Sequence, residues 1–417
     1  MSPDASTAGA AQSMNRVAVT GLGLVCALGN TVAECWPRLA AGECGIRPLQ
    51  DPGNPPYKFR MGAEAQTFRP LDYFTEKDLL LLERFALLAT AAAREAVAQS
   101  GIQFAGDLAD ESAVVTGSSV GGQFSEEEGY LRLYRENNPR VAPLTIPRTM
   151  ANAGASRISL EFGIHGPAYT VATACSSSNH AIGQAFWMVR SGQMKAAIAG
   201  GSEAVFAEGL LRAWEAMRVV SPDVCRPFSA DRRGLSLGEG AGMLVLENWD
   251  HAKARGAKIL GEMVGFGMSS DAHHITQPCA EGPAKAMKWA LKDAAISPNQ
   301  IGYINAHGTG TQANDVTETQ AIRQVFGSHA DKVLVSSTKS MHGHTLGAAG
   351  GIEAIMTILA LHDGVAPPTA NFTAPDPACN LNVVANEARS ASLEFAMSNT
   401  FAFGGLNATL VFKRADE

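Results

Sequence analysis

Short apolar stretches alternate with longer amphipathic, alanine-rich stretches along most of the chain. The apolar stretches run into glycines, whereas the longer stretches repeat their apolar residues at helical spacing. This alternation is typical of strands joined by helices, and it therefore predicts an α/β fold. In the first half, the predicted strands cover residues 17–23, 111–122, 169–174 and 196–205.

Two helices and one irregular segment separate these strands. Asn30 is placed to cap a helix over residues 31–41, and residues 79–100 form a long predicted helix with an apolar face. Residues 126–151 are polar and contain prolines. We expect this segment to leave the sheet rather than to form part of it.

A second series of the same kind begins near residue 256. It repeats the order of strand, glycine turn and helix without visible sequence identity to the first, which predicts two similar halves. We expect a loose tail over residues 1–13, an N-terminal half over 14–255 and a C-terminal half over 256–417. The second half contains predicted strands over 258–270, 301–311 and 333–344, and predicted helices over 281–295, 316–326 and 347–362.

Composition narrows the class of protein. A chain of 417 residues with 46% hydrophobic and 18% charged residues can form large cores, and its net charge of −7 argues against nucleic acid as a partner. The seven cysteines are odd in number and contain no CxxC pair, which favours a reducing cytoplasm over a disulfide framework or zinc site. The first residues do not resemble a signal peptide, and no apolar run approaches the roughly 18 residues that span a bilayer, so we expect no membrane contact.

Cys175 lies where a predicted strand becomes a helix, within YTVATACSSSNHAIGQ (169–184). Unpaired backbone N–H groups at a helix start favour a thiolate, so we expect the pKa of Cys175 to lie below the value of about 8.5 for a free thiol. The alternative is a buried structural cysteine, which is common among small residues.

Three other polar side chains occupy comparable places. His307 and the Lys339/His344 pair also follow predicted strands, and open α/β sheets bind ligands at the carboxyl ends of parallel strands. A thiol, two imidazoles and a lysine suit acyl transfer to sulfur followed by a step that develops negative charge. His342 and His344 have the spacing of metal ligands, but no third ligand is evident, so we expect no metal.

Four motifs resemble those of the β-ketoacyl-acyl carrier protein synthases, most closely the elongating type II branch. They are TACSSS around Cys175, NAHGTGT around His307, STKSMHGH around Lys339 and His344, and SNTFAFGGLNA over residues 398–408. The resemblance runs from about residue 17 to residue 412 in one unbroken order. It implies a thiolase-like fold, with two duplicated α/β halves in five αβαβα layers, that works as a dimer.

The resemblance also implies a reaction. Cys175 would take an acyl chain from a carrier protein, with the backbone N–H groups of Cys175 and Phe403 as the oxyanion hole. His307 and His344 would stabilise the enolate left when malonyl carrier protein loses CO₂, and the carbanion would attack the acyl group on Cys175. The product would be a 3-oxoacyl thioester two carbons longer.

Further residues are assigned only through the resemblance. Lys339 would order the histidines and pair with Glu318, and Phe403 would gate the acyl pocket. Thr309 and Thr311 would bind the phosphopantetheine amides. Phosphopantetheine would arrive on the carrier protein, and no cofactor would be bound to this chain.

Several positions depart from the pattern of the family. Ala402 replaces a glycine of the gate loop, and Leu144–Thr145 replaces an aromatic pair that commonly crosses the dimer interface. Val120 occupies a position where isoleucine is common in the family, and Trp214 one where phenylalanine is usual. These changes predict a reshaped acyl pocket that suits a chain other than a plain saturated one.

The surface expected to dock the acidic carrier protein also differs. Arg140 and Arg218 match basic positions of the family, whereas Leu80 and Leu81 stand where a basic pair is frequent. The leucines either extend the core face of their helix or form an exposed patch for a more hydrophobic partner. That partner would be a different carrier protein or a non-identical subunit.

We therefore expect a condensing enzyme of fatty acid or type II polyketide or polyene biosynthesis, with a preference for the latter. It would be a homodimer or a heterodimer with a chain-length-factor-like subunit. A degradative thiolase is one alternative, but the second cysteine usual in that branch is absent from residues 401–408. A chain-length subunit without chemistry is another, and Cys175 argues against it.

Overall fold

The computed structural model describes residues 14–415. Hydrogen bonding joins ten strands in the order β10-β9-β13-β14-β8-β1-β7-β6-β4-β5. Their bounds are β1 Val17–Val25, β4 Ser112–Gly117, β5 Ala168–Val171, β6 Ala196–Glu203, β7 Gly240–Asn248, β8 Gly261–Ser270, β9 Ile301–Asn305, β10 Leu334–Ser336, β13 Phe395–Ala402 and β14 Leu406–Arg414. Two small hairpins are formed by β2 (Arg47–Pro48) with β3 (Met61–Gly62) and by β11 (Val365–Ala366) with β12 (Arg389–Ser390).

The ten strands fall into two sets with the same topology. In chain order the first set is β1, β4, β5, β6 and β7, and the second is β8, β9, β10, β13 and β14. In both sets the spatial order is third, second, fourth, fifth and first. Within residues 14–415, strand pairing between the two sets joins Val17–Val19 of β1 to Gly261–Met263 of β8. The expected duplicated α/β fold is confirmed.

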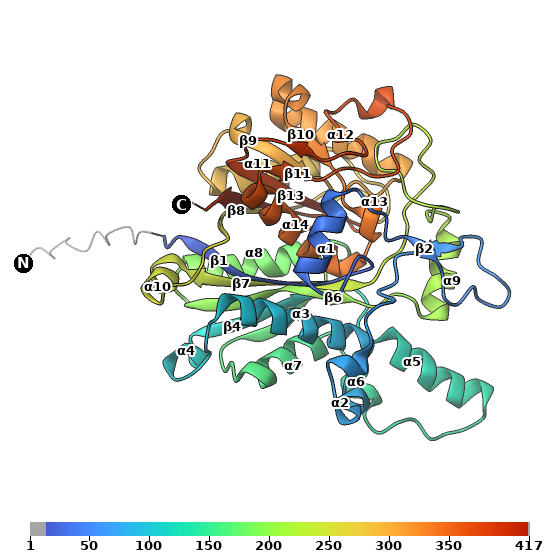
Figure 1. The fold of residues 1–417 in the computed structure, drawn as a ribbon. Coiled ribbons are helices and arrows are strands. Elements are labelled where there is room, and N and C mark those ends of the chain that lie inside the picture. The colour runs from blue at the N-terminus through green and yellow to red at the C-terminus, as the bar shows by residue number, and fades with distance from the viewer. Residues whose placement is uncertain (1–13, 416–417) are drawn as a thin grey trace, which may run out of the picture.

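Two helices lie between the two sets of strands (Figure 1). Helix α8 (Ser177–Arg190) packs on β4 and β6, and α14 (Ala349–Asp363) packs on β7 and β13 and contacts α8. Outer helices cover the other faces, with α3 (Arg84–Ser100) against β1 and β7 and α11 (Glu281–Asp293) against β8 and β14. The molecule therefore has five layers.

The remaining helices are short or lie at the edges of this arrangement. They are α1 Val32–Ala40, α2 Glu76–Leu81, α4 Asp107–Asp110, α5 Gln123–Tyr130, α6 Thr145–Thr149, α7 Ala153–Phe162, α9 Glu208–Met217, α10 Trp249–Ala254, α12 Gln312–Phe326 and α13 Lys339–His342.

The central position of α14 explains its composition. Together with the turn before it, residues 346–363 are long and apolar enough to cross a membrane, contrary to our expectation from the sequence, but 83% of this stretch is buried inside the protein. A helix covered on both sides by sheets is apolar all round, as a core helix must be.

Some predicted boundaries are wrong for local reasons. The helix predicted over residues 79–100 is divided into α2 and α3, because Leu82 is extended and the Glu83 side chain accepts the Phe85 N–H to start a new helix. Thr31, not Asn30, caps α1, since its side chain accepts the Glu34 N–H. The strand predicted over residues 333–344 ends at Ser336.

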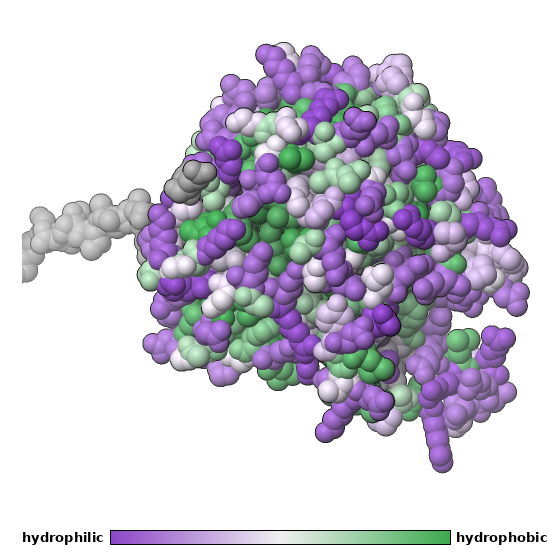
Figure 2. Space-filling model, viewed as in Figure 1, coloured by the Kyte–Doolittle hydropathy of each residue, from purple (hydrophilic) through white to green (hydrophobic). Residues whose placement is uncertain are grey.

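The segment predicted to leave the sheet does so. Helix α5 continues into a π-helix, η2 (Leu131–Arg135), and α6 follows after an irregular stretch. This segment protrudes from the body at the lower right of Figure 1. The face shown in Figure 2 is mostly hydrophilic, with small groups of hydrophobic residues between polar ones.

Candidate active site

Cys175 occupies the turn between β5 and α8, directly before the helix. The turn is tight: Ala174 has a φ of 50°, which is unusual for a residue with a side chain, and the Ser177 hydroxyl accepts the Thr173 N–H at 2.9 Å. The side chain of Cys175 is buried but lines two cavities. The structure thus places the thiol at the end of a strand, as the sequence predicts.

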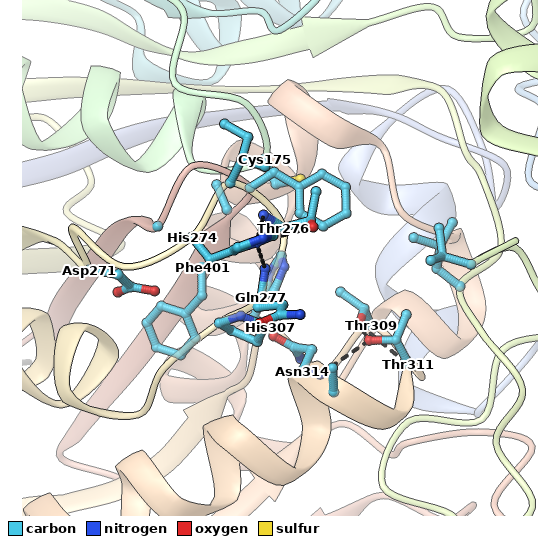
Figure 3. A pocket seen from close by; sticks show the side chains of 18 of the residues that line it. Cys175, Asp271, His274, Thr276, Gln277, His307, Thr309, Thr311, Asn314 and Phe401 are labelled. Carbon is cyan, nitrogen blue, oxygen red and sulfur yellow. Dashed lines mark hydrogen bonds between the residues drawn. The ribbon is translucent and has the colours of Figure 1, made fainter. Parts of the chain in front are cut away.

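The second half supplies two imidazoles to this thiol. Nε2 of His344 lies 3.2 Å from Sγ of Cys175, and the rings of His307 and His344 stand nearly perpendicular with centroids 5.4 Å apart. One polar atom from each of Cys175, His307 and His344 lies within 4.8 Å of the others. Figure 3 shows Cys175 and His307 around the same cavity. Residues 169 positions apart in the sequence therefore converge.

A backbone contact fixes the tautomer of His344. The Leu346 N–H donates to Nδ1 at 3.2 Å, so in the neutral ring the proton resides on Nε2. Burial, followed by the charge of Lys339, holds the pKa of both His307 and His344 well below its usual range. His344 is therefore a neutral donor. An Nε2–H group has no lone pair for a metal, so this cluster is poorly suited to metal binding despite its short distances.

The electrostatics of Cys175 differ from the sequence prediction. Burial raises the pKa of the thiol to about 11, and the opposing effects of Lys339 and of the backbone N–H groups of Phe403 and Cys175 do not offset it. The predicted lowered pKa is therefore wrong for the free enzyme. The reason is that the helix start lies inside the protein, where desolvation of the thiolate outweighs the helix dipole.

This pKa predicts the pH dependence of alkylation. Only the thiolate reacts, and its fraction rises about tenfold for each pH unit while the pH stays below the pKa. We expect the rate of Cys175 modification by iodoacetamide, followed by mass spectrometry, to rise about tenfold per unit between pH 7 and 9.5. A rate that levels off near pH 8 would contradict the raised pKa.

Lys339 has a different partner from the one predicted. Its Nζ forms a buried ion pair with Glu353 on α14, not with Glu318. Glu318 instead accepts the backbone N–H groups of His307 at 2.8 Å and Gly308 at 2.7 Å. Burial raises the pKa of each of these two carboxyls to about 7. Glu353 thus holds the lysine, and Glu318 holds the loop that carries His307.

The pair predicts a pattern of stability changes. We expect Lys339→Met to lower the free energy of unfolding by about 3–5 kcal/mol, because the buried Glu353 carboxyl loses its ion-pair partner and must take up a proton or stay charged without one. The double variant Lys339→Met with Glu353→Leu should recover much of this loss, whereas Lys339→Met with Glu318→Leu should not. Urea unfolding of the three variants measures the difference. If the double variant with Glu318→Leu recovered stability and the one with Glu353→Leu did not, Lys339 would be paired with Glu318, as the sequence predicted.

Two cavities meet at Cys175. The first, of about 130 Å³, is lined by both histidines and by Thr309 and Thr311, whose hydroxyls lie 2.9 Å apart. The second, of about 360 Å³, is lined by Val120 and Leu346. The remaining shared walls are Trp214 and Phe403. Both cavities are lined mostly by apolar side chains, but the first also contains the histidines and threonines, so the second is called the apolar cavity below.

Phe403 forms the boundary between the cavities. Its ring stacks on Trp214 at a centroid distance of 6.2 Å and is 36% exposed. The turn after it depends on Gly404 and Gly405, which have φ values of 83° and 70°. Ala402 lies at the end of β13 in strand conformation. The loss of glycine at position 402 therefore causes no strain in this conformation.

Comparison with known proteins identifies the family. The chain matches the model of the β-ketoacyl synthase N-terminal domain over residues 14–252 and that of the C-terminal domain over residues 260–373. The chain belongs to the β-ketoacyl synthases. It is an acyltransferase that condenses acyl chains in fatty acid or polyketide biosynthesis, as the sequence predicted.

Related sequences and related solved structures agree with this assignment. The synthase is 44% identical over 399 residues to nodulation protein E of Rhizobium sp. (strain N33), covering 96% of this chain and 99% of the relative. It is 40% identical over 407 residues to 3-oxoacyl-[acyl-carrier-protein] synthase 2 of Synechocystis, covering 96% and 98%. It resembles the solved ishigamide ketosynthase/chain length factor with a TM-score of 0.92 and 35% identity, covering 97% and 100%.

Other predicted site residues of the synthase lie away from Cys175. Thr145, on α6, lines neither cavity of this chain, and its hydroxyl donates to the Ala142 carbonyl at 2.8 Å. Arg140 and Arg218 are exposed. Leu80 and Leu81 are 66% and 43% exposed, so the alternative that they extend the core face of a helix is wrong. They form part of the surface of this chain.

The sequence analysis did not single out two buried carboxylates, Glu353 and Glu203. Glu353 is the single charged residue in the apolar stretch GGIEAIMTILA, and this contrast was an available signal. Glu203, at the end of β6, accepts the Ser118 hydroxyl at 2.8 Å and the N–H groups of Ser119 at 2.7 Å and Gly347 at 3.0 Å. It connects the wall of the apolar cavity to the turn after His344.

Proposed function

We propose that Cys175 accepts the acyl chain from the phosphopantetheine arm of a carrier protein. The new bond joins Sγ to the acyl carbon, the bond to the phosphopantetheine sulfur breaks, and the thiol proton passes to that leaving sulfur. The N–H groups of Cys175 and Phe403 stabilise the oxyanion. Nε2 of His344 already carries a proton, so His344 acts as a donor here and not as the base.

The same histidines then act on malonyl carrier protein. The bond to the carboxylate breaks, CO₂ leaves, and the enolate oxygen accepts hydrogen bonds from His344 and His307. The carbanion attacks the acyl carbon, and the Cys175 thiolate leaves and takes a proton. Thr309 and Thr311 line the cavity through which the phosphopantetheine would enter. No other cofactor takes part in this proposal.

The distance of 3.2 Å between Nε2 of His344 and Sγ of Cys175 is the observation that carries the proposal. The test is incubation of the purified protein with acyl and malonyl carrier proteins. We expect equal amounts of CO₂ and of a 3-oxoacyl carrier protein two carbons longer. Acyl exchange without CO₂ release would instead favour the degradative thiolase alternative. Failure of Cys175 to take up any acyl group would favour a chain-length subunit.

We propose a polyketide or polyene pathway ahead of primary fatty acid elongation. Trp214 and Val120 reshape the apolar cavity, and the likeness to the ishigamide ketosynthase/chain length factor and to nodulation protein E supports a dedicated pathway. Product profiling with several carrier proteins distinguishes the pathways.

We propose that the synthase works as a dimer in the cytoplasm. Strand β5 ends the strand order and offers an unpaired edge, and Thr145 would reach the partner's acyl cavity. The ishigamide relative is named for a ketosynthase and a chain length factor, which supports a non-identical partner as well as a second copy of this chain. All seven cysteines, which lie in the described part of the chain, are free, as expected in a reducing compartment.

A further inference from the structure

The turn after His344 is held from both sides by side chains of the first half. The N–H of Gly347 donates to the Glu203 carboxylate and to the Ser119 hydroxyl, at 3.0 Å in each case. The carbonyl of Gly347 accepts the hydroxyl of Ser178, which lies in the first turn of α8. Both polar backbone groups of this glycine are therefore fixed by residues that precede it by more than 140 positions.

The turn needs such support because its backbone is strained. Leu346 has a φ of 45°, which a residue with a side chain adopts rarely and keeps only where its surroundings hold it. A Cβ atom at position 347 would lie 2.5 Å from the backbone nitrogen of Ser119 and 2.6 Å from an oxygen of Glu203. Glycine at this position therefore lets the carboxylate approach the backbone closely.

The same turn sets the position of a proton on His344. The N–H of Leu346 donates to Nδ1 of the ring at 3.2 Å, so the proton of the neutral ring resides on Nε2, which faces Cys175. If the turn relaxed, Nδ1 would lose this donor and could carry the proton itself. That tautomer has no N–H directed at the thiol or at a group bonded to it.

Glu203 is well suited to hold this turn. It lies at the end of β6 and is fully buried. Besides Gly347, its oxygens accept the hydroxyl of Ser118 at 2.8 Å and the N–H groups of Ser119 at 2.7 Å and Val120 at 3.3 Å. A carboxylate offers about four acceptor sites and no donor, so one side chain can connect the segment after β4 to the turn after His344.

We propose that Glu203 is a positioning residue, which keeps the proton of His344 on Nε2 by fixing Gly347. Glu203 lines neither cavity, so it acts through the turn and not on the substrate. Ser178 assists it from the carbonyl side of the same glycine. This inference rests on the proposed function, since it takes His344 to be the donor to the enolate oxygen.

The first test measures decarboxylation of malonyl carrier protein. We expect Glu203→Ala to lower kcat about 10–100-fold, because a misplaced donor costs this much, and to leave KM within about twofold. Glu203→Gln should keep kcat within about threefold of the parent value, since its amide oxygen can still accept the Gly347 N–H.

A matched control removes a comparable carboxylate elsewhere. Glu95, on α3, is half-buried, lines neither cavity and accepts the N–H groups of Leu24 and Val32 at 2.8 Å each. Glu95→Ala should therefore leave both kcat and KM for malonyl carrier protein unchanged. A fall in kcat as large as that of Glu203→Ala would show a general loss of structure and would contradict the proposal.

The second test observes the imidazole directly. Nuclear magnetic resonance of protein labelled with ¹⁵N-histidine distinguishes protonated from unprotonated ring nitrogens, and the spectrum of His344→Gln identifies the resonances of position 344 by their absence. We expect the proton on Nε2 in the parent protein and in Glu203→Gln. In Glu203→Ala, a second species with the proton on Nδ1 should appear, which a change in stability alone does not produce.

The two measurements together decide the matter. An unchanged tautomer in Glu203→Ala would overturn the proposal, whether or not kcat falls. If Glu203→Ala does not fold, Ser178→Ala must show the second tautomer, and a spectrum like that of the parent would overturn the proposal equally. If the parent protein releases no CO₂ from malonyl carrier protein, the proposed function fails, while the spectra still decide whether Glu203 fixes the proton of His344.

Discussion

Replacing Cys175 with glutamine is expected to abolish condensation while malonyl decarboxylation continues. Without Sγ no acyl thioester forms, and loss of a nucleophile of this kind costs at least about 10⁴-fold in turnover. Decarboxylation depends instead on His307, His344 and the lysine that adjoins them. The glutamine amide occupies part of the space of an acylated cysteine, so malonyl carrier protein should still bind.

The two activities are measured separately. Release of labelled CO₂ from malonyl carrier protein reports decarboxylation, and mass spectrometry of the carrier protein reports the 3-oxoacyl product. Cys44→Ser is the matched control, because Cys44 is a half-buried thiol outside both cavities. Residual condensation at more than about one hundredth of the parent rate in Cys175→Gln would mean that another group carries the acyl chain.

For His344→Ala we expect the reverse, namely that Cys175 is still acylated while malonyl decarboxylation is lost. This change removes the neutral Nε2–H donor that faces Cys175, and loss of one donor to a developing oxyanion typically costs about 10²–10³-fold. Decarboxylation and condensation should both fall by this factor. Acylation of Cys175 should persist, because its oxyanion is held by backbone N–H groups and His344 does not take the thiol proton.

A conservative variant identifies the cause of that loss. Glutamine at position 344 keeps an N–H donor without an ionisable ring, so His344→Gln should retain more decarboxylation than His344→Ala. If acylation of Cys175 stops in both variants while decarboxylation stays normal, His344 serves the thiol and not the enolate. Weighing the acyl-enzyme and collecting CO₂ decide between these outcomes.

The sequence predicted the candidate site residues better than the pairings in the interior. Cys175, His307 and His344 could be found because each lies at or after the end of a predicted strand, where α/β sheets bind ligands. In the structure, β5 lies at one end of the strand order and β9 and β10 at the other, so Cys175 meets the histidines because both sets of strands pack on α8 and α14. Glu353 could not be assigned in this way. It lies in the second turn of α14 and meets Lys339, at the start of α13, only in the assembled core. The spacing of residues along the sequence does not indicate an ion pair between two different helices.

The prediction for the thiol failed for a related reason. A helix start lowers a thiol pKa when water still solvates the anion, but Cys175 is buried together with the start of α8. Burial is a property of the assembled layers and not of the segment 169–184. In the same way, the exposure of Leu80 depends on where α2 ends, and α2 ends at Leu81 because Glu83 begins another helix.

The short β1–β8 junction has a consequence for how activity appears during synthesis. Cys175 belongs to the half that is synthesised first, and His307 and His344 belong to the half that is synthesised last. A ribosome-bound chain that stops before residue 344 therefore has the thiol but lacks the full pair of imidazoles that would act on the malonyl group. Domains made first tend to fold first. Competence for carbon–carbon bond formation therefore emerges late, after α14 of the second half has been made and has packed on β6 and β7 of the first half.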